Sequence, residues 1–370
     1  MKKLLFLINS LNGGGAEKVL VDMVNALDKQ KYDITVQTLI NDGVYVNTLN
    51  ENIHYKSIIK AKSKGLRKLL SYLIQFVIPP SVVYKLFIRG DYDVETAYLE
   101  GAPLKLIAAS DSHARKLTWV HIDLYNYDHN TKLFKSTAHN AECYKRFDKI
   151  ICVSGEVEEM FLKKFGEFNN TQVQYNVLDE VEILKKSEEE CELSTSNGLR
   201  FVTVGRLAHQ KGYDRLIDVF ARLKSEGITP ELIILGQGPD RGELEKQIKS
   251  AGLDNVKLMG FQKNPYKYIA SSDVFICSSR AEGFSTVATE AILLGKPIVT
   301  TDCAGMHDLL GDSEYGLITE NDENALYEGI KAIINNKNLL EHYREQATKR
   351  REYFKKETRI KEIEHLLNEG

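Results

Sequence analysis

The chain has 370 residues, of which 43% are hydrophobic and 27% are charged. These proportions are typical of soluble globular proteins and exclude a collagenous, low-complexity or wholly disordered chain. The net charge of −3, from 49 basic and 52 acidic residues, argues against a nucleic-acid-binding protein, which would carry a basic excess.

The first half of the chain alternates strand-like and helix-like segments. Residues 3–8 predict a buried strand and residues 12–15 a glycine loop, and the apolar side chains that recur along residues 16–27 predict one face of a helix. Further strands are expected at residues 34–39, 94–98, 116–120 and 149–153. This alternation is typical of an α/β domain with a parallel sheet, which we assign to residues 1–185.

A basic stretch lies within this half. Residues 52–90 contain no Asp or Glu but eight Lys and Arg residues. Residues 66–77 predict a helix with one apolar side, opposite Arg67 and Lys68. Because such a helix suits an anionic membrane surface, we expect the basic region 56–89 to dock there. The alternative is an ordinary domain helix with a basic outer face.

A second alternating cycle begins near residue 199. Its strands are predicted at residues 200–204, 231–235, 256–259, 274–277, 297–300 and 316–318. Its helices are predicted at residues 213–226, 241–251, 265–271, 285–294 and 323–335. The sequence therefore predicts two Rossmann-like, doubly wound parallel-sheet domains that face each other across a cleft.

The remaining segments complete the predicted organisation. Residues 186–198 are acidic and then polar, which favours a linker before the second domain at residues 199–345. Residues 339–367 form a long charged helical pattern, and we expect the C-terminal helix at 346–370 to pack back on the first domain.

Cysteine usage and hydropathy give expectations about the compartment. The five cysteines form no CxxC pair and no Cys/His cluster with zinc-ligand spacing. The apolar runs are too short or too interrupted for a signal peptide or a membrane span. We therefore expect a cytoplasmic protein, peripheral on the inner face of the cell membrane.

The loop Gly205-Arg206-Leu207-Ala208-His209-Gln210-Lys211-Gly212 follows a predicted strand and opens a predicted helix. Two cations five residues apart, beside the free N–H groups of a helix N-terminus, suit a diphosphate. A solvated loop that happens to be basic is an equally good interpretation of this motif alone.

A second strand-to-helix segment runs from Arg280 to Glu290. In it Gly283 permits an unusual backbone, and Ser285 is placed to cap the helix. A carboxylate at Glu290 would repel a diphosphate but can accept two hydrogen bonds from a ribose diol, and Glu282 could hold sugar hydroxyls. The alternative is a pair of exposed glutamates, although Glu290 adjoins a buried helix face and would need a partner there.

The pattern Gly-Arg-Leu-x3-Lys-Gly followed by Glu282-x7-Glu290 resembles the retaining glycosyltransferases of family 4, which have the GT-B fold. The similarity extends to further motifs: Leu235-Gly236-Gln237-Gly238-Pro239, Met259-Gly260-Phe261, Ala270-Ser271-Ser272-Asp273, Gly295-Lys296-Pro297-Ile298-Val299, Gly13-Gly14-Gly15-Ala16-Glu17, Trp119-Val120-His121 and Cys152-Val153-Ser154. It covers nearly the whole chain.

The resemblance implies a role for each matching residue. Arg206 and Lys211 would neutralise the donor diphosphate, Glu290 would bind the ribose, and Glu282 would bind the transferred sugar. The backbone of Gly260 and Phe261 would contact the base, and His121 would contact the donor sugar. Gly14 and Gly15 would let the backbone approach the phosphate or sugar. The donor would also be bound by five loop residues: Gly205, Gly283, Phe284, Ser285 and Thr286. From the residues alone, His121 is equally a packed histidine.

The resemblance also implies an activity. It predicts a metal-independent, retaining glycosyltransferase of the hexosyltransferase class that uses no cofactor besides its nucleotide-sugar donor, with a UDP-sugar favoured. The expected acceptor is a lipid-linked saccharide in the assembly of a bacterial surface polysaccharide such as a capsule. Asp91-Tyr92-Asp93 matches a metal-binding signature of transferases with another fold, but here it predicts a turn before a strand.

Two other functions remain open. A nucleotide-sugar 2-epimerase-like enzyme with the same fold would not need the basic region or a lipid acceptor. A non-catalytic glycosyltransferase partner subunit should have lost donor-binding residues that are present in this chain.

Overall fold

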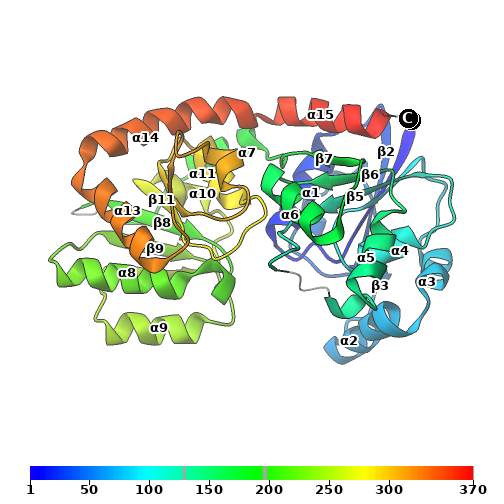
Figure 1. Cartoon of the computed structure of the whole chain (residues 1–370), viewed down its shortest axis with the longest axis horizontal. Helices are drawn as coiled ribbons and strands as arrows, with labels where there is room; N and C mark the ends of the chain where they lie inside the picture. The colour runs from blue at the N-terminus through cyan, green and yellow to red at the C-terminus, as the bar shows by residue number, and fades with distance from the viewer. Residues whose placement is uncertain (128–130, 195–197, 370) are drawn as a thin grey trace. The chain divides into compact units, whose positions relative to one another are not determined.

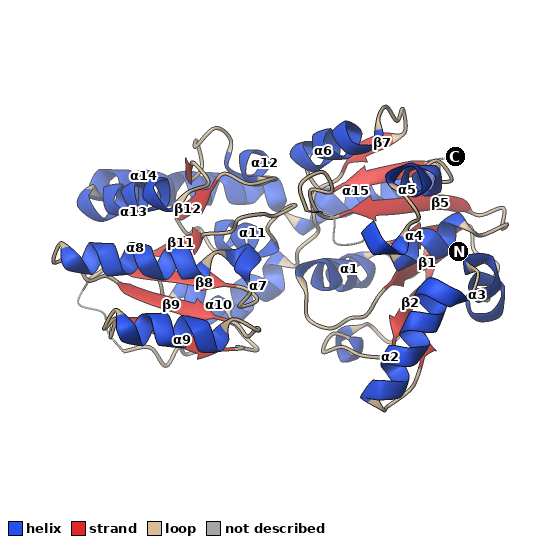
Figure 2. Ribbon diagram, turned by 60° about the horizontal axis from the view of Figure 1, so that its bottom comes forward, coloured by secondary structure: helices blue, strands red, loops and turns tan. Residues whose placement is uncertain are grey.

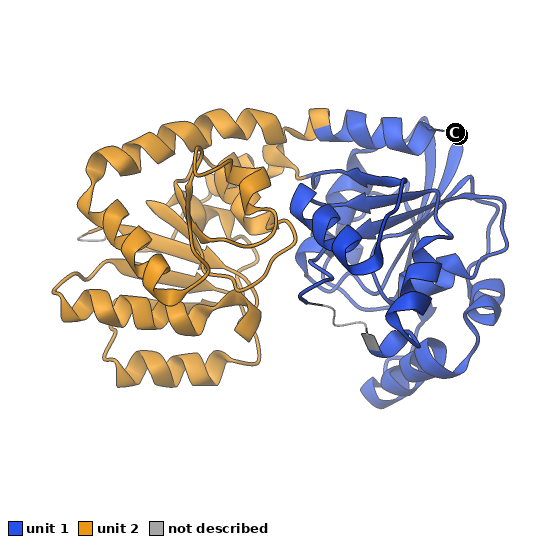
Figure 3. Cartoon of the chain, in the orientation of Figure 1, with its two compact units in different colours: residues 1–177, 359–370 blue, residues 178–358 orange. Residues whose placement is uncertain are grey.

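The structure is a computed structural model that describes residues 1–127, 131–194 and 198–369. It contains two compact units, unit 1 formed by Met1–Val177 with Arg359–Gly370 and unit 2 formed by Leu178–Thr358 (Figure 3). Each unit is a parallel sheet covered by helices (Figure 2), so the predicted α/β class with two Rossmann-like domains is confirmed.

Unit 1 is built on a seven-stranded sheet with the order β3-β2-β1-β4-β5-β6-β7. Its strands are β1 (Lys2–Ile8), β2 (Tyr32–Ile40), β3 (His54–Ile59), β4 (Val94–Ala97), β5 (Arg115–Val120), β6 (Lys149–Cys152) and β7 (Thr171–Val173). All neighbouring strands pair in parallel. The strand order reverses between β1 and β4.

Helices flank this sheet in unit 1 (Figure 1). They are α1 (Gly15–Ala26), η1 (Val46–Thr48), α2 (Lys64–Tyr72), η2 (Leu73–Val77), α3 (Pro80–Phe87), α4 (Ala102–Ala108), η3 (Thr131–Leu133), α5 (Thr137–Tyr144), α6 (Gly155–Phe165) and most of α15 (Lys356–Asn368). Because helices cover the sheet, central strands such as β1 are apolar along most of their length rather than alternating, and residues 4–8 are fully buried.

Unit 2 repeats this architecture with six parallel strands in the order β10-β9-β8-β11-β12-β13. The strands are β8 (Arg200–Val204), β9 (Glu231–Leu235), β10 (Val256–Gly260), β11 (Val274–Cys277), β12 (Ile298–Thr301) and β13 (Leu317–Thr319). The helices are α7 (Glu180–Ser187), η4 (His209–Lys211), α8 (Tyr213–Ser225), α9 (Arg241–Ser250), α10 (Tyr266–Ala270), α11 (Thr286–Leu293), α12 (Met306–Leu310), α13 (Glu323–Asn335), α14 (Lys337–Arg350) and η5 (Arg351–Phe354).

The boundary between the units differs from the predicted one. Unit 1 ends at Val177 rather than at residue 185. The first part of the expected linker belongs to unit 2, because Asn264 donates from Nδ2 to the carbonyl of Lys186 at 2.8 Å and so joins the end of α7 to the loop before α10. Residues 195–197 of that linker lie outside the described residues.

The long C-terminal helix predicted from the charge pattern is interrupted. α14 ends at Arg350 and α15 starts at Lys356, with the short helix η5 between them. At this interruption Phe354 is only 1% exposed, and its ring lies 5.9 Å from the ring of Phe284. From Arg359 onward α15 belongs to unit 1.

Two short strands of unit 1 were not predicted. β3 and β7 are the outer strands of the sheet, and most of their residues are only partly buried. Neither carries the continuous apolar run that marks a buried parallel strand, so hydropathy alone misses them.

The basic region contains β3 and two helices that are joined by a single π-helical turn, η2. α2 has no buried residue. Eight of the fifteen exposed large apolar side chains among the described residues lie here: Leu66, Leu69, Tyr72, Phe76, Val77, Val82, Leu86 and Phe87. The outer face of this α2–α3 segment is therefore apolar as well as basic, unlike the basic outer face of an ordinary domain helix. None of the described helices is both long and apolar enough to span a bilayer.

Candidate active site

The strand order of unit 2 reverses between β8 and β11, which are neighbours in the sheet. The loops that leave their carboxyl ends, residues 205–212 and 278–285, therefore start side by side. Ligands of open α/β sheets bind at such a reversal. The fold thus brings together the two motifs identified in the sequence.

Glycines make the first loop compact. A Cβ on Gly205 would lie 2.7 Å from the Tyr213 hydroxyl and 3.3 Å from Cε of Lys211, so its absence lets the Lys211 side chain lie across the backbone. Gly212 has a φ of +64°, and a Cβ there would lie 2.1 Å from the Ser278 carbonyl oxygen. Gly212 therefore lets the two loops approach each other closely.

Side chains also connect the two loops. The Arg280 guanidinium donates to both carboxylate oxygens of Asp214 at 2.7 Å. Burial alone would raise the pKa of Asp214, but the hydrogen bonds and charge of Arg280 outweigh it, and this pKa is lowered. Gln210 adds a bond from Nε2 to the Ala281 carbonyl at 2.9 Å. The loops are therefore one rigid structure rather than two independent segments.

A buried arginine fixes the start of the second loop. Arg215, in the first turn of α8, is 6% exposed. It donates to the carbonyls of Ser278 at 2.7 Å and Ser279 at 2.8 Å, and also to Oδ1 of Asn321 at 2.8 Å. These bonds orient the backbone three residues before Glu282.

Lys211 and Glu282 form an ion pair inside this structure. Nζ of Lys211 lies 2.6 Å from Oε1 of Glu282, and the side chains are 21% and 9% exposed. Burial alone would lower the pKa of Lys211, but the Glu282 carboxylate outweighs it and the pKa is raised. Lys211 therefore remains a cation, and part of its charge is already offset by Glu282.

Arg206 differs from Lys211 in its surroundings. It is exposed. Among the residues that the structure describes, it has no hydrogen bond or ion-pair partner. Of the two cations predicted to bind a diphosphate, only Arg206 is thus unpaired.

The N-terminus of α11 supplies hydrogen-bond donors next to these charges. The predicted cap is confirmed, because Oγ of Ser285 accepts from the Ala288 N–H at 3.4 Å. Within the described part of the chain, the N–H groups of Thr286 and Val287 have no protein acceptor, so they are available to an anion. Phe284, by contrast, is buried beside Phe354 and holds the loop in place with its side chain.

Glu290 lies one turn further along α11 and is 3% exposed. Its Oε1 accepts a hydrogen bond from the Tyr266 hydroxyl of α10 at 3.0 Å. This is the partner that a carboxylate on a buried helix face needs. At the end of β10, Gly260 has a φ of +72° and Phe261 is 56% exposed, which leaves an aromatic ring on the surface.

The glycine loop of unit 1 carries an unpredicted feature. The space where a Cβ of Gly14 would lie is occupied by the Glu17 carboxylate, 2.1 Å from that position. Burial raises the pKa of Glu17. A carboxylate over Gly14 and next to Gly15 disfavours a phosphate there, so of the two ligand groups predicted for these glycines the sugar fits better.

His121 follows β5 in unit 1. Burial is the main reason that its pKa is lowered to about 4, and a hydrogen bond to the Tyr98 backbone offsets part of this effect. Its ring lies 4.9 Å from the ring of Tyr98, and its Nε2 is buried without a partner among the described residues. His121 is therefore a packed, neutral imidazole that still has one free acceptor.

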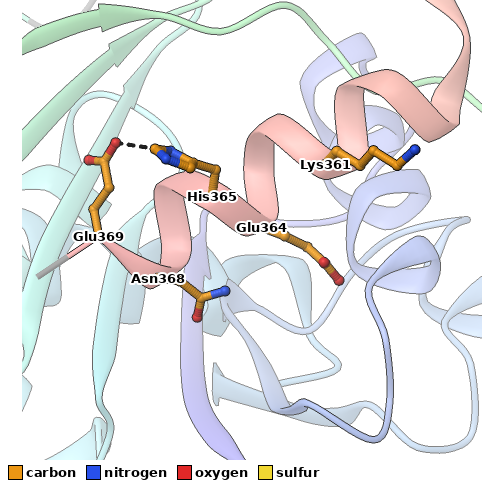
Figure 4. Close-up of a pocket in the computed structure, with 5 residues that line it drawn as sticks. All are labelled: Lys361, Glu364, His365, Asn368 and Glu369. Carbon is orange, nitrogen blue, oxygen red and sulfur yellow. Dashed lines mark ion pairs between the residues drawn. The ribbon is translucent and has the colours of Figure 1, made fainter.

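A surface pocket of unit 1 lies along α15. It is lined by Lys361, Glu364, His365, Asn368 and Glu369, and His365 pairs with Glu369 at 3.2 Å (Figure 4). It contains none of the predicted site residues.

Three residues that the sequence analysis did not identify organise the site in unit 2: Arg215, Tyr266 and Ser279. Each contacts a group that is distant in the sequence, for example Tyr266 and Glu290 at 24 residues. A single sequence shows no sign of such contacts. Gly14, Gly15 and His121 belong to unit 1, whereas the other predicted residues belong to unit 2.

Profiles of two known families match the chain in tandem. "Glycosyltransferase Family 4" matches residues 13–181, and "Glycosyl transferases group 1" matches residues 185–350. The sequence is 30% identical over 366 residues to N-acetylgalactosamine-N,N'-diacetylbacillosaminyl-diphospho-undecaprenol 4-alpha-N-acetylgalactosaminyltransferase of Campylobacter jejuni, with 96% of each chain covered. It is 24% identical to the amylovoran biosynthesis glycosyltransferase AmsD of Erwinia amylovora, with 100% of each chain covered.

Solved structures are similar over the whole chain. HepE of Anabaena, in complex with UDP and glucose, matches with a TM-score of 0.77 at 21% identity, and 100% of each chain is covered. TarM of S. aureus matches with a TM-score of 0.76 at 15% identity, again with 100% of each chain covered. These similarities confirm the predicted GT-B fold.

Proposed function

This chain belongs to glycosyltransferase family 4. We propose that it moves a sugar from a nucleoside diphosphate sugar, with UDP as the nucleotide, to a hydroxyl of a lipid-linked saccharide. The observation that carries the proposal is the arrangement at the β8/β11 reversal. There the loop that carries the exposed Arg206 starts beside the loop that leads into α11, and the second loop and α11 carry the buried carboxylates of Glu282 and Glu290. Cations and amides suit a diphosphate, and carboxylates suit the sugar hydroxyls on either side of it.

The donor fits this site as follows. Arg206, Lys211 and the N–H groups of Thr286 and Val287 would stabilise the charge that develops on the leaving diphosphate. Glu290, oriented by Tyr266, would accept from the ribose diol. The exposed ring of Phe261 offers the base a surface for stacking. HepE and TarM were both solved with UDP, which supports UDP as the nucleotide.

The chemistry we propose retains the configuration of the donor sugar. The acceptor oxygen bonds to the anomeric carbon on the face from which the diphosphate departs. The bond between that carbon and the diphosphate breaks, and the hydroxyl proton passes to the diphosphate. Because side-chain cations and helix amides stabilise the leaving group, this step needs no divalent metal ion.

The acceptor is inferred from a relative and from the basic region. The Campylobacter jejuni relative is named for a diphospho-undecaprenol-linked substrate, and the Erwinia amylovora relative for amylovoran biosynthesis. These names support a lipid-linked saccharide acceptor in bacterial polysaccharide assembly. Such an acceptor requires the enzyme to work at a membrane surface.

The α2–α3 segment is suited to that surface. Its inward side is anchored in unit 1 by the buried side chains of Ile74 and Val83 and by two hydrogen bonds. The Tyr84 hydroxyl donates to the buried carboxylate of Glu95, and Gln37 donates to the Phe87 carbonyl at 2.9 Å. Its exposed side is apolar and lies within a stretch that has eight cations and no carboxylate. We propose that this side docks on an anionic bilayer, with the apolar side chains among the lipids and the lysines at the phosphates.

The experiment is a transfer assay with purified protein, a panel of radiolabelled UDP- and GDP-sugars, and polyprenyl-diphosphate saccharide as acceptor. We expect a UDP-sugar to label the lipid product, and an α-linked donor sugar to give an α linkage. The transfer rate should be the same with and without EDTA. The Arg206→Ala variant should lose this activity, whereas Lys249→Ala, which removes an exposed cation on α9, should keep it. Epimerised nucleotide sugar instead of lipid product would contradict the proposal.

A further inference from the structure

Within the described structure, the Glu282 carboxylate is held through only one of its two oxygens. Oε1 accepts from Nζ of Lys211 at 2.6 Å and from Oγ of Ser279 at 2.5 Å. The Cys277 thiol approaches the same oxygen at 3.9 Å. No hydrogen bond to Oε2 occurs among the described residues.

Ser279 is itself rigidly placed and 1% exposed. Its carbonyl accepts from the Thr301 hydroxyl at 2.6 Å and from Nη2 of Arg215 at 2.8 Å. The Cys277 thiol donates to its hydroxyl at 3.5 Å. Contacts from α8 and β12 thus fix the backbone of Ser279, and the thiol from β11 contacts its hydroxyl beside Glu282.

A glutamate carboxylate rotates easily about its last torsion angle, so its two oxygens exchange places unless donors distinguish them. Lys211 alone cannot hold one carboxylate oxygen in place once a nucleotide sugar binds, because its ammonium is then shared between Glu282 and the diphosphate. The neutral Ser279 hydroxyl has no such competing ligand and stays on Oε1.

We propose that Ser279 is a positioning residue, which holds Oε1 of Glu282 so that Oε2 accepts a hydroxyl of the transferred sugar. The inference rests on the proposed function, since it takes Glu282 as the sugar-binding carboxylate. Ser279 does not touch the sugar; it determines which oxygen of Glu282 does.

The test compares two variants with a matched control. Ser279→Ala removes the hydroxyl but leaves the carbonyl bonds to Arg215 and Thr301. Ser279→Cys replaces it with a weaker donor. Ser272→Ala, in the same unit, removes another buried hydroxyl, which donates to the Tyr268 carbonyl at 2.8 Å. For each protein, calorimetry gives the Kd of UDP and of UDP-glucose and UDP-N-acetylgalactosamine, and the transfer assay gives kcat and KM for whichever sugar is used.

We expect Ser279→Ala to bind UDP within about twofold of the wild type, since its hydroxyl donates to Glu282, the carboxylate assigned to the sugar, and to no group assigned to the nucleotide. Its kcat should fall roughly tenfold, because a hydrogen bond to a charged group is lost. The ratio of the affinity for the nucleotide sugar to the affinity for UDP should also fall. Ser279→Cys should lie between these values, and Ser272→Ala should match the wild type.

Equal weakening of UDP and nucleotide-sugar binding would mean that Ser279 only supports the loop, and would overturn the positioning role. Unchanged kcat in Ser279→Ala, or in Ser279→Cys if the alanine variant does not fold, would also overturn it. If the wild type binds neither UDP nor any nucleotide sugar, the proposed function fails and this inference fails with it. If the wild type transfers sugar and only the Ser279 prediction fails, the proposed function stands.

Discussion

Nζ of Lys211 lies 2.6 Å from Oε1 of Glu282, although 71 residues separate them in the chain. The sequence assigns the lysine to the diphosphate and the glutamate to the sugar. In the structure they form one ion pair at the junction of two loops. The groups predicted to bind adjacent parts of the donor are therefore coupled before any donor is present.

This coupling predicts a stability effect. Lys211→Met leaves the Glu282 carboxylate, which is 9% exposed, without its cation. We expect the free energy of unfolding in urea to fall by about 2 kcal/mol, less than for a fully buried pair because Lys211 is partly exposed. Lys211→Met/Glu282→Gln should recover most of the loss. Equal destabilisation in the single and double variants would show that the pair is not the cause.

The Tyr266–Glu290 bond predicts an effect on nucleotide binding. Tyr266→Phe removes the donor to a buried carboxylate, so we expect UDP to bind roughly tenfold more weakly. Tyr268→Phe is the matched control, because that tyrosine of the same helix donates to Gln262 at 3.2 Å instead. Calorimetric titration with UDP distinguishes the two variants. Equal affinity of both for UDP would remove Tyr266 from the binding site.

The basic and the apolar side chains of the α2–α3 segment and its N-terminal flank predict two separate contributions to vesicle binding. Exchange of the exposed cations Lys62, Lys64 and Lys68 for Gln should weaken sedimentation with phosphatidylglycerol vesicles and reduce its salt dependence. Exchange of Leu69 and Phe76 for Ser should weaken it at every salt concentration. Both sets should retain UDP binding, since UDP is expected to bind unit 2.

A triple exchange of Lys246, Lys249 and Lys349 for Gln is the control, because these exposed lysines of unit 2 carry the same total charge. Undiminished vesicle binding by the first two variants, or equal loss in the control, would return the α2–α3 segment to the role of an ordinary surface helix.

His121 predicts a dependence of stability on pH. Its pKa is about 4 in the folded chain, against 6.5 for the unperturbed group. Between these values the unfolded chain binds a proton that the folded chain does not, so the free energy of unfolding falls as the pH falls. The loss amounts to at most about 3 kcal/mol. His121→Gln should show a smaller loss in urea unfolding at pH 7 and pH 4.5, whereas His113→Gln, at an exposed position, should follow the wild type.

The sequence identifies the elements that local patterns encode. The buried strands of both sheets, the two strand-to-helix loops and the Ser285 cap depend on hydropathy and on residues a few positions apart. It does not identify what depends on distant partners. The pairing of Lys211 with Glu282, the Tyr266 bond and the turn at Phe354 each require the folded chain.

The expected phosphate approach at Gly14 shows the same distinction. Three consecutive glycines correctly indicate a tight loop before α1. Only the structure shows that the Glu17 carboxylate fills the space above Gly14, because that depends on how the first turn of the helix folds back.

The central claim is that the loops at the β8/β11 reversal bind the donor diphosphate, with Arg206 as the unpaired cation. Calorimetric titration of UDP into the wild type, Arg206→Ala and Lys249→Ala tests it most directly. We predict that UDP binds the wild type and Lys249→Ala equally, and that Arg206→Ala binds at least tenfold more weakly without a change in its unfolding midpoint. Equal UDP affinity for all three proteins would contradict the account.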